Sequence, residues 1–432
     1  PPSVASVATA IPGFVGYTER GTKNTAIRVE SLIDFEEKFG YACKIAISEE
    51  DKINGLEYKL HESMRLFYAN GGGICYVVSV GNYTDAISNT ALETGISMLE
   101  PIDEVTMIVV PDAVSLEIKD LASVQNAALA QCLELKDRVA ILDVKDTGNC
   151  NTDATNFRNS IGTKGASYGA AYYPYIKSVY DREINVYDIY KGLELSNQEL
   201  ENAQYYAELS EPTEESTLFA KQLMSKPEYA KLVAKIQEQA NLLPPSGAIA
   251  GIYCANDNQR GVWHAPANMS VSGISDINVR ISDKQQGELN ENTSGKCINA
   301  IRAFQGKGIL VWGARTLDGL SSEWKYISVR RFFNYVEESI QESTAWAVFQ
   351  PNDANTWVKV RCQIENFLSN LWRDGALAGS TPQEAFYVRV GINQTMTAQD
   401  ILNGYMIVEI GMAAVRPAEF IVLQFSHKLQ ES

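Results

Sequence analysis

Short, mostly apolar runs alternate with helical patterns between residues 56 and 176, and this alternation limits the possible folds more than any other feature. The runs are residues 74–80, 105–110, 139–144 and 170–176. Before the first run, Leu60, Met64 and Phe67 fall at helical spacing, and three glycines close the segment. Continuously apolar strands are typical of parallel sheets that helices cover on both faces. We therefore predict an α/β fold with a central parallel sheet.

The N-terminal region adds one strand and one short helix to this prediction. An extended lead precedes an apolar strand at residues 11–17. Ser31 with Asp34 three residues later is typical of a capping box, and Gly40 ends the helix after Phe39.

Residues 192–242 interrupt the α/β pattern. Seven glutamates and no lysine or arginine lie between Glu194 and Glu215, and lysines then alternate with apolar residues as far as Gln239. This charge pattern predicts a solvated, acidic helical insertion. An exposed helical pair without a specific task is the simplest interpretation, and a lid over an active site is the alternative.

The composition is that of a globular protein with an acidic surface. Hydrophobic residues make up 45% of the chain and charged residues 21%, and the net charge is −16. A nucleic-acid binder needs a clustered basic face, so this charge argues against one. The seven cysteines are widely spaced and none forms a C-x-x-C pair, which favours buried thiols in a reducing cytoplasm. We expect no signal peptide, and no apolar run reaches the roughly 20 residues that span a bilayer.

Motifs that carry chemistry are weak in this chain. Three glycines at 71–73 follow a helix and precede a strand, whereas phosphate-binding loops follow a strand and open a helix. The three histidines, His61, His264 and His427, have no partner at metal-ligand spacing. No G-x-S-x-G elbow is present for a Ser-His-Asp triad. We therefore assign no catalytic, cofactor-binding or metal-binding residues and expect no enzyme activity.

Several segments of the C-terminal half resemble contractile tail sheath proteins of phages and of extracellular phage-tail-like injection systems. Residues 243–268 read LPPSGAIAGIYCANDNQRGVWHAPAN, in which P-P-S-G, A-G, R-G-V-W and A-P-A-N match the sheath pattern. We expect Ser246 to cap the helix that starts there, and the small residues to let it pack closely. The other matching segments are QGKGILVWGARTLDGL at 305–320, RDGALAGSTPQEAF at 373–386 and EIGMAAVRPAEFIVLQFS at 409–426.

The resemblance implies a domain division. Residues 1–20 would form an N-terminal arm and strand that pack with the C-terminal domain. Residues 21–275 would form an outer α/β domain with the acidic insertion, and residues 276–432 a sheath-type α+β domain. A strand arm at 416–432 would complete this last domain.

The resemblance also implies a function. Such a subunit polymerises with itself as stacked hexameric rings around an inner tube protein, between a baseplate and a terminator cap. Contraction then drives the tube through a target cell envelope. The protein would be made in the bacterial cytoplasm and would join a phage tail or a released extracellular particle, with related sheath proteins as further partners. We expect no nucleic-acid partner, no cofactor and no direct insertion into a membrane. The alternatives are a hydrolase-like α/β enzyme with a helical lid and a non-contractile tail or baseplate protein.

Two candidate interaction sites follow from the C-terminal half. The apolar run Glu419, Phe420, Ile421, Val422, Leu423, Gln424 and Phe425 is predicted to be a strand that either pairs with residues 405–412 in an internal hairpin or joins a neighbouring subunit. The resemblance favours the second arrangement. A predicted helix at 357–372, which ends in a glycine-rich turn at 375–379, carries Lys359, Arg361 and Arg373. These cations either contact an acidic inner tube or form salt bridges within the domain.

Overall fold

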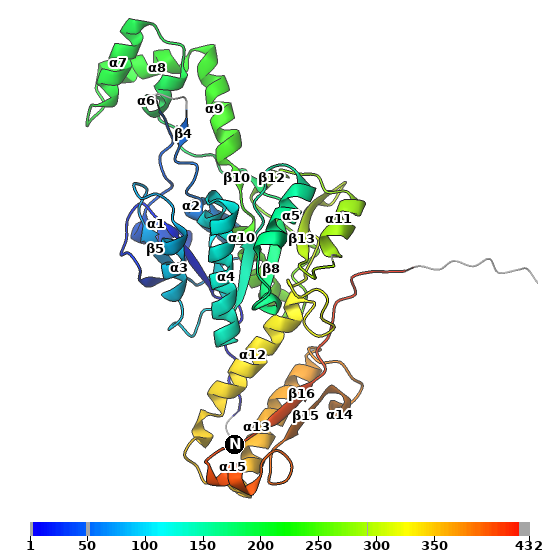
Figure 1. The fold of residues 1–432 in the computed structure, drawn as a ribbon. Helices are drawn as coiled ribbons and strands as arrows, with labels where there is room; N and C mark the ends of the chain where they lie inside the picture. The colour runs from blue at the N-terminus through cyan, green and yellow to red at the C-terminus, as the bar shows by residue number, and fades with distance from the viewer. Residues whose placement is uncertain (1–2, 49–51, 292, 423–432) are drawn as a thin grey trace, which may run out of the picture.

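A nine-stranded sheet forms the centre of the molecule in the computed structural model, which describes residues 3–48, 52–291 and 293–422 (Figure 1). Strands β5, β1, β6, β7, β8 and β13 are parallel, which confirms the predicted α/β fold with a parallel core. The antiparallel strands β2, β14 and β11 lie at its two ends. In sheet order the strands are β11 (Met269–Ser270), β14 (Gly308–Val311), β13 (Ile298–Phe304), β8 (Gly169–Tyr173), β7 (Val139–Asp143), β6 (Met107–Val109), β1 (Pro12–Tyr17), β5 (Cys75–Gly81) and β2 (Ala26–Val29).

Helices cover both faces of this sheet. Successive residues of β1 belong to different clusters, with Phe14 in one and Val15 in the other, because side chains of a strand point alternately to its two faces. The residues that define the two clusters are buried, as the apolar runs predict. The helices packed around the sheet are α1 (Leu32–Phe39), α2 (Leu60–Ala69), α3 (Asn89–Ser97), α4 (Ile118–Leu135), α5 (Cys150–Ser160), α10 (Ser246–Arg260) and α11 (Asp283–Asn290).

Glycines let helices α2 and α10 approach closely. A Cβ atom at Gly251 would lie 2.4 Å from the carbonyl oxygen of Phe67, and one at Gly247 would lie 2.6 Å from that of Ser63. The expected close packing of the small residues is therefore confirmed. The expected cap at Ser246 is wrong, because Ser246 is the first helical residue and its hydroxyl donates to Asp143 instead.

The helical insertion projects from one end of the molecule (Figure 1). It contains α6 (Val186–Ile189), α7 (Asn197–Ala207), α8 (Glu214–Met224) and α9 (Pro227–Ala240). The insertion therefore has more helices than the expected pair. It also begins before residue 192, because Val186 and Tyr190 pack with Phe219 in the core of the insertion. At its base lie the sheet of β9 (Ile176–Ser178), β10 (Leu242–Leu243) and β12 (Ile274–Ile277) and the hairpin of β3 (Ala46–Ile47) and β4 (Ile53–Asn54).

A separate C-terminal unit, residues 327–414, lies at the opposite end of the molecule (Figure 1). Its apolar core includes Phe332 and Val336 of one long helix and Ile364 and Leu368 of a second long helix. A two-stranded antiparallel sheet packs against these helices. The unit contains α12 (Ile327–Ser343), α13 (Ala354–Arg373), α14 (Pro382–Ala385), β15 (Phe386–Arg389), α15 (Ala398–Leu402) and β16 (Glu409–Met412).

Two of the expected domain boundaries disagree with the domains in which the segments pack. The N-terminal residues divide their contacts: Ala5 and Val7 donate backbone hydrogen bonds to Ser343 and Ser339 of α12, but β1 is a central strand of the large sheet. Residues 276–311 include β13 and β14, so they pack with the central sheet rather than with the C-terminal unit. We attribute both differences to strand pairing, which joins segments far apart in the sequence.

Candidate functional site

The root of the C-terminal arm is held by a charged contact. The Glu419 carboxylate accepts hydrogen bonds from Arg315 Nε at 2.8 Å and from Arg315 Nη2 at 2.8 Å, and from the Tyr326 hydroxyl at 3.0 Å. The Arg315 side chain is 5% exposed and that of Glu419 is 19% exposed. Two donors from one planar guanidinium make this a bidentate, charge-assisted pair. Burial raises the pKa of Tyr326, and the neighbouring Glu419 carboxylate raises it further, to about 12.

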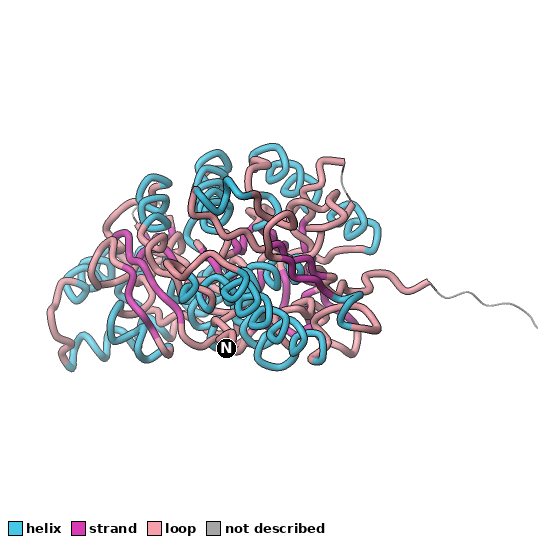
Figure 2. Tube along the Cα trace, turned by 90° about the horizontal axis from the view of Figure 1, so that it is seen from below, coloured by secondary structure: helices cyan, strands magenta, loops and turns pink. Residues whose placement is uncertain are grey.

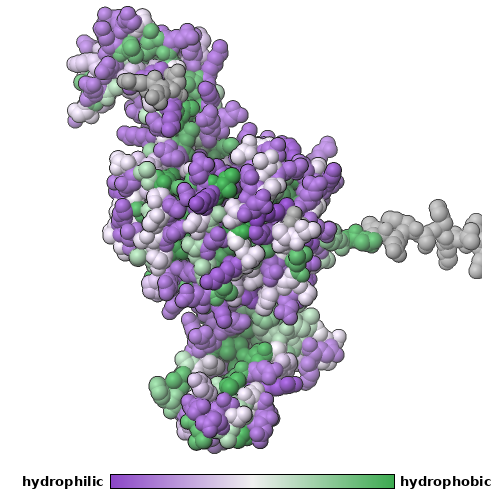
Figure 3. Space-filling model, in the orientation of Figure 1, coloured by the Kyte–Doolittle hydropathy of each residue, from purple (hydrophilic) through white to green (hydrophobic). Residues whose placement is uncertain are grey.

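Beyond Glu419 the described chain leaves the body of the protein. Phe420, Ile421 and Val422 are largely exposed and belong to no strand. The described start of the arm projects outward in the ribbon and the tube views, and its apolar residues are visible in the space-filling view (Figures 1, 2 and 3). The predicted internal hairpin is absent among residues 405–422, because β16 pairs with β15 instead. The remaining predicted strand residues, Leu423, Gln424 and Phe425, lie outside the described residues.

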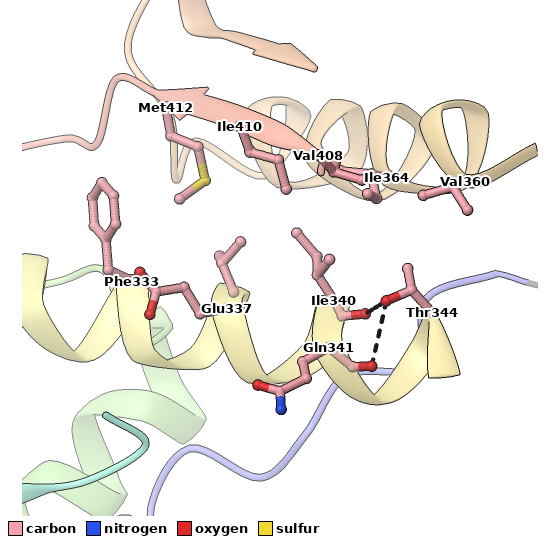
Figure 4. Close-up of a pocket in the computed structure, with 11 residues that line it drawn as sticks. Phe333, Glu337, Ile340, Gln341, Thr344, Val360, Ile364, Val408, Ile410 and Met412 are labelled. Carbon is pink, nitrogen blue, oxygen red and sulfur yellow. Dashed lines mark hydrogen bonds between the residues drawn. The ribbon is translucent and has the colours of Figure 1, made fainter. Parts of the chain in front are cut away.

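An apolar groove of about 270 Å³ lies in the C-terminal unit, between α12 on one side and α13 and β16 on the other (Figure 4). In the described part of the chain β16 pairs with β15 alone, so its other edge is open. The groove can therefore accept apolar side chains from an extended segment that pairs with this edge. Its apolar lining residues are Phe333, Val336 and Ile340 from α12, Val360 and Ile364 from α13, and Val408, Ile410 and Met412 from β16 and the residue preceding it.

The three predicted tube-contact residues do not share one surface. Lys359 and Arg373 are fourteen positions apart, close to four helical turns of about 3.6 residues, so they lie on the same exposed side of α13. Arg361 points elsewhere and lies 3.9 Å from Glu365 one turn along the helix. Arg373 also donates to the Asn370 side chain at 3.2 Å. Only Lys359 and Arg373 therefore form a candidate surface.

The buried carboxylates have structural roles in this fold. The Asp112 side chain accepts from the backbone nitrogens of Tyr17 and Lys59, so it joins the end of β1 to the start of α2. Asp143 accepts from the backbone nitrogen and the hydroxyl of Ser246 at 2.9 and 2.5 Å, which ties β7 to α10. Desolvation raises the pKa of each carboxyl to about 7.

The histidines and glycines have ordinary structural surroundings. His61 Nε2 lies 3.0 Å from the Glu36 carboxylate, His264 lines a surface groove, and His427 is outside the described residues. Gly71, at a φ of 101°, follows the end of α2 as the glycine motif predicts. Among residues 3–48, 52–291 and 293–422, no group of three or more His, Cys, Asp or Glu side chains is placed to hold a metal.

Comparison with known families agrees with this geometry. Residues 85–317 match the phage tail sheath protein central domain, and residues 321–428 match the phage tail sheath C-terminal domain. The chain belongs to the phage tail sheath family. This sheath chain is 23% identical over 192 residues to the tail sheath protein of Vibrio phage KVP40, and 25% identical over 126 residues to that of Enterobacteria phage T4. Those matches span 44% and 29% of the chain but only 27% and 19% of the relatives.

Solved sheath structures match almost the whole sheath chain. The PVC sheath complex of an extracellular contractile injection system, in its contracted state, is 31% identical with a TM-score of 0.71. The match covers 99% of this chain and 94% of the PVC sheath chain. The contracted helical sheath of the anti-feeding prophage is 30% identical with a TM-score of 0.69, and covers 99% and 95%. The family resemblance and the mixed α/β fold are therefore confirmed.

Sequence reasoning missed the partner of Glu419 in this sheath chain. Arg315 is 104 residues away and is separated from Glu419 by the whole C-terminal unit. The one available signal was a lone arginine in the apolar segment GILVWGARTLDGL, where a buried charge requires a partner.

Proposed function

We propose that this chain is the structural subunit of a contractile sheath that polymerises around an inner tube and shortens to drive the tube through a cell envelope. The observation that carries the proposal is an exposed apolar arm together with an apolar groove beside an open strand edge in the same chain. An arm and a groove on different surfaces make a heterologous contact, which produces rings or helical polymers rather than closed two-fold dimers.

The arm of one copy is the proposed occupant of the groove of the next copy. Residues 420–425 would span about 20 Å as an extended strand, at roughly 3.3 Å per residue. The segment is therefore longer than the four-residue strand β16, and the open edge of β16 would bind the arm backbone. Alternate side chains of Phe420, Val422 and Gln424 would face one side and Ile421, Leu423 and Phe425 the other. Such pairing by main-chain hydrogen bonds would persist while the subunits rotate during contraction.

The likeness to injection-system sheaths supports partners for this assembly. The similar structures include a sheath complex, a helical sheath and a baseplate. We extend these to the present chain as self-assembly on an inner tube, with a baseplate and a terminator cap at the ends. Related sheath proteins would share the particle, which would be built in the cytoplasm and act outside it. Lys359 and Arg373 would meet acidic groups on the tube.

The helical insertion would lie on the outer surface of the sheath. It stands at the opposite end of the molecule from the C-terminal unit, which carries both the groove and the two exposed cations of α13 (Figure 1). Its exposed glutamates suit solvent, and exposed loops tolerate added chain.

A structural role accounts for the relatives better than catalysis does. The matched relatives are sheath proteins, which favours a structural subunit over a hydrolase-like enzyme with a helical lid. None of the described helices combines the length and hydropathy needed to cross a membrane.

Negative-stain imaging of the purified chain tests this proposal. We expect helical tubes, whereas a small oligomer without helical order would refute it. A small folded tag inserted between Ser210 and Glu211, in an exposed loop of the insertion, should leave the tubes intact and add density outside them. The same tag after Gln350, at the far end of the C-terminal unit, is expected to block assembly around a tube.

A further inference from the structure

The segment between the C-terminal unit and the arm crosses a second open groove, which is separate from the groove between α12 and β16. Val415 is fixed at one end, where its backbone nitrogen donates to the carbonyl of Ala376. Glu419 is fixed at the other end by Arg315 and Tyr326. The groove has a volume of about 940 Å³ and is lined by residues 415–421 together with Trp263, Trp312 and Tyr326. The connecting residues 416–418 therefore form a strap, attached mainly at its ends.

We propose that Arg315, Tyr326 and Glu419 form a releasable anchor that fixes the root of the arm and sets how far the arm can reach. The proposal rests on the proposed function, because it concerns the arm that links sheath subunits. Arg416, which donates to the carbonyl of Ser322 from an exposed position, is a secondary contact along the strap.

The anchor connects the arm to the central sheet rather than to the C-terminal unit from which it emerges. The backbone nitrogen of Arg315 donates to the Asn299 side chain at 2.7 Å, and Asn299 Nδ2 donates to the carbonyl of Ala171 at 3.1 Å. Asn299 and Ala171 lie on the neighbouring strands β13 and β8. Tension on a bound arm would thus pass through Glu419 and Arg315 into two buried strands of the central sheet.

Releasing the anchor would lengthen the free arm by a definite amount. With Glu419 held, the free arm starts at Phe420. With Glu419 released, it starts after Val415, so four more residues become free. At about 3.3 Å per extended residue these add about 13 Å of reach.

The chemistry of the anchor suits release without loss of the fold. Glu419 lies at the edge of the groove and keeps partial contact with water, while Arg315 is almost fully buried. After release, Arg315 would keep its hydrogen bond from Nη1 to the carbonyl of Asn290 at 2.8 Å, and water entering the groove would solvate the rest of the guanidinium. The anchor can therefore open locally, which a pair buried on both sides could not do at low cost.

Mobility of a spin label at Ala418 tests the anchor in the folded monomer. Ala418→Cys places a nitroxide on the exposed strap, with Cys43 and Cys362 replaced by serine to avoid labelling at these partly exposed thiols. We expect Glu419→Gln to lower the ratio of immobile to mobile spectral components about tenfold or more, as loss of hydrogen bonds to a charged group predicts. Glu323→Gln, an exposed carboxylate near the same segment, should leave the spectrum unchanged. Identical spectra for Glu419→Gln and the unsubstituted chain would overturn the proposal.

Tubes formed by the same variants test the effect on reach. Glu419→Gln should still form tubes, because the arm itself is intact, but with a helical twist and rise that vary along each tube. A lattice as regular as that of the unsubstituted chain would also overturn the proposal. Tyr326→Phe removes one hydrogen bond of the anchor and should give a smaller effect in both experiments. It replaces Glu419→Gln as the test variant if Glu419→Gln does not fold. Absence of tubes for every chain would instead refute the proposed function, and the spin-label result would still decide on the anchor.

Discussion

Arg331 and Asp257 form a buried ion pair at the junction between the central domain and the C-terminal unit. Arg331 Nη1 lies 3.0 Å from Asp257 Oδ1, and both side chains are 3% exposed. The guanidinium also lies 4.5 Å from the ring centroid of Tyr253 and donates to the carbonyl of Thr9 at 3.2 Å. One side chain of α12 therefore holds α10 and the N-terminal segment together.

Loss of one partner of this pair should destabilise the monomer strongly. We expect Asp257→Asn to lower the free energy of unfolding by about 3–5 kcal/mol, because it leaves a buried guanidinium without a counter-charge. Urea denaturation measures the change. The control Arg280→Gln breaks an exposed pair with Asp276 and should cost less than about 1 kcal/mol. A similar small cost for both variants would contradict the role of the buried pair.

Stability should fall as pH rises, in part because of Asp143. Its pKa is raised from 3.8 to about 7 by desolvation, so the folded state holds a proton that the unfolded chain has lost. That contribution is complete below pH 3.8 and is lost as pH rises toward 7. Asp143→Asn can still hydrogen-bond to Ser246 but does not titrate. Within this window it should make the fall of the unfolding free energy with pH shallower by up to about 1.4 kcal/mol per pH unit. Parallel curves of unfolding free energy against pH for the two proteins would contradict the assignment.

Phe349 combines full exposure with an unfavourable backbone conformation. Its φ is 64°, in the left-handed region that bulky residues avoid, and the ring is entirely exposed. We expect Phe349→Asn to raise the free energy of unfolding by about 0.5–1 kcal/mol, because Asn tolerates this conformation. Val348→Asn removes a neighbouring exposed side chain at an ordinary φ of −64° and should change stability by less than about 0.5 kcal/mol. Equal effects of the two substitutions would exclude backbone strain as the cause.

Charge reversal on α13 should separate tube binding from self-assembly. We expect Lys359→Glu with Arg373→Glu to reduce the fraction of extended sheath on tubes and to leave contracted tubes unchanged. Arg361→Glu is the matched control, because Arg361 points away from the other two side chains and is near Glu365. Electron microscopy of both assemblies provides the measurement. If the double variant still gave normal amounts of extended sheath, the tube would be bound elsewhere.

The sequence predicted the parallel strands β1, β5, β6, β7 and β8 because each had a local signal, but it missed the parallel strand β13. Residues 139–142 are apolar and lie between the charged residues Arg138 and Asp143, and they form most of the buried parallel strand β7. The stop at Gly40 and the cap at Ser31 also depend only on neighbouring residues, and both are found. Local patterns suffice where the local backbone and the tertiary fold agree.

The sequence did not predict contacts that depend on long-range placement. The open edge of β16 became evident only because β15, about 20 residues earlier, takes its other edge. The pair of Arg315 with Glu419 joins segments 104 residues apart, and no local pattern specifies it. The different directions of Lys359 and Arg361 followed from helical phase, which the sequence already contained, but only once the bounds of α13 were known.

Removal of the arm is the most direct test of a sheath held together by arm exchange. A chain that ends at Glu419 keeps the anchor and every described strand but lacks the segment proposed to bind the next subunit. Electron microscopy of this chain and of the full chain at equal concentration provides the comparison, with thermal unfolding as the check on folding. We predict helical tubes from the full chain and only folded monomers from the shortened chain. Tubes of normal lattice from the shortened chain would contradict the account.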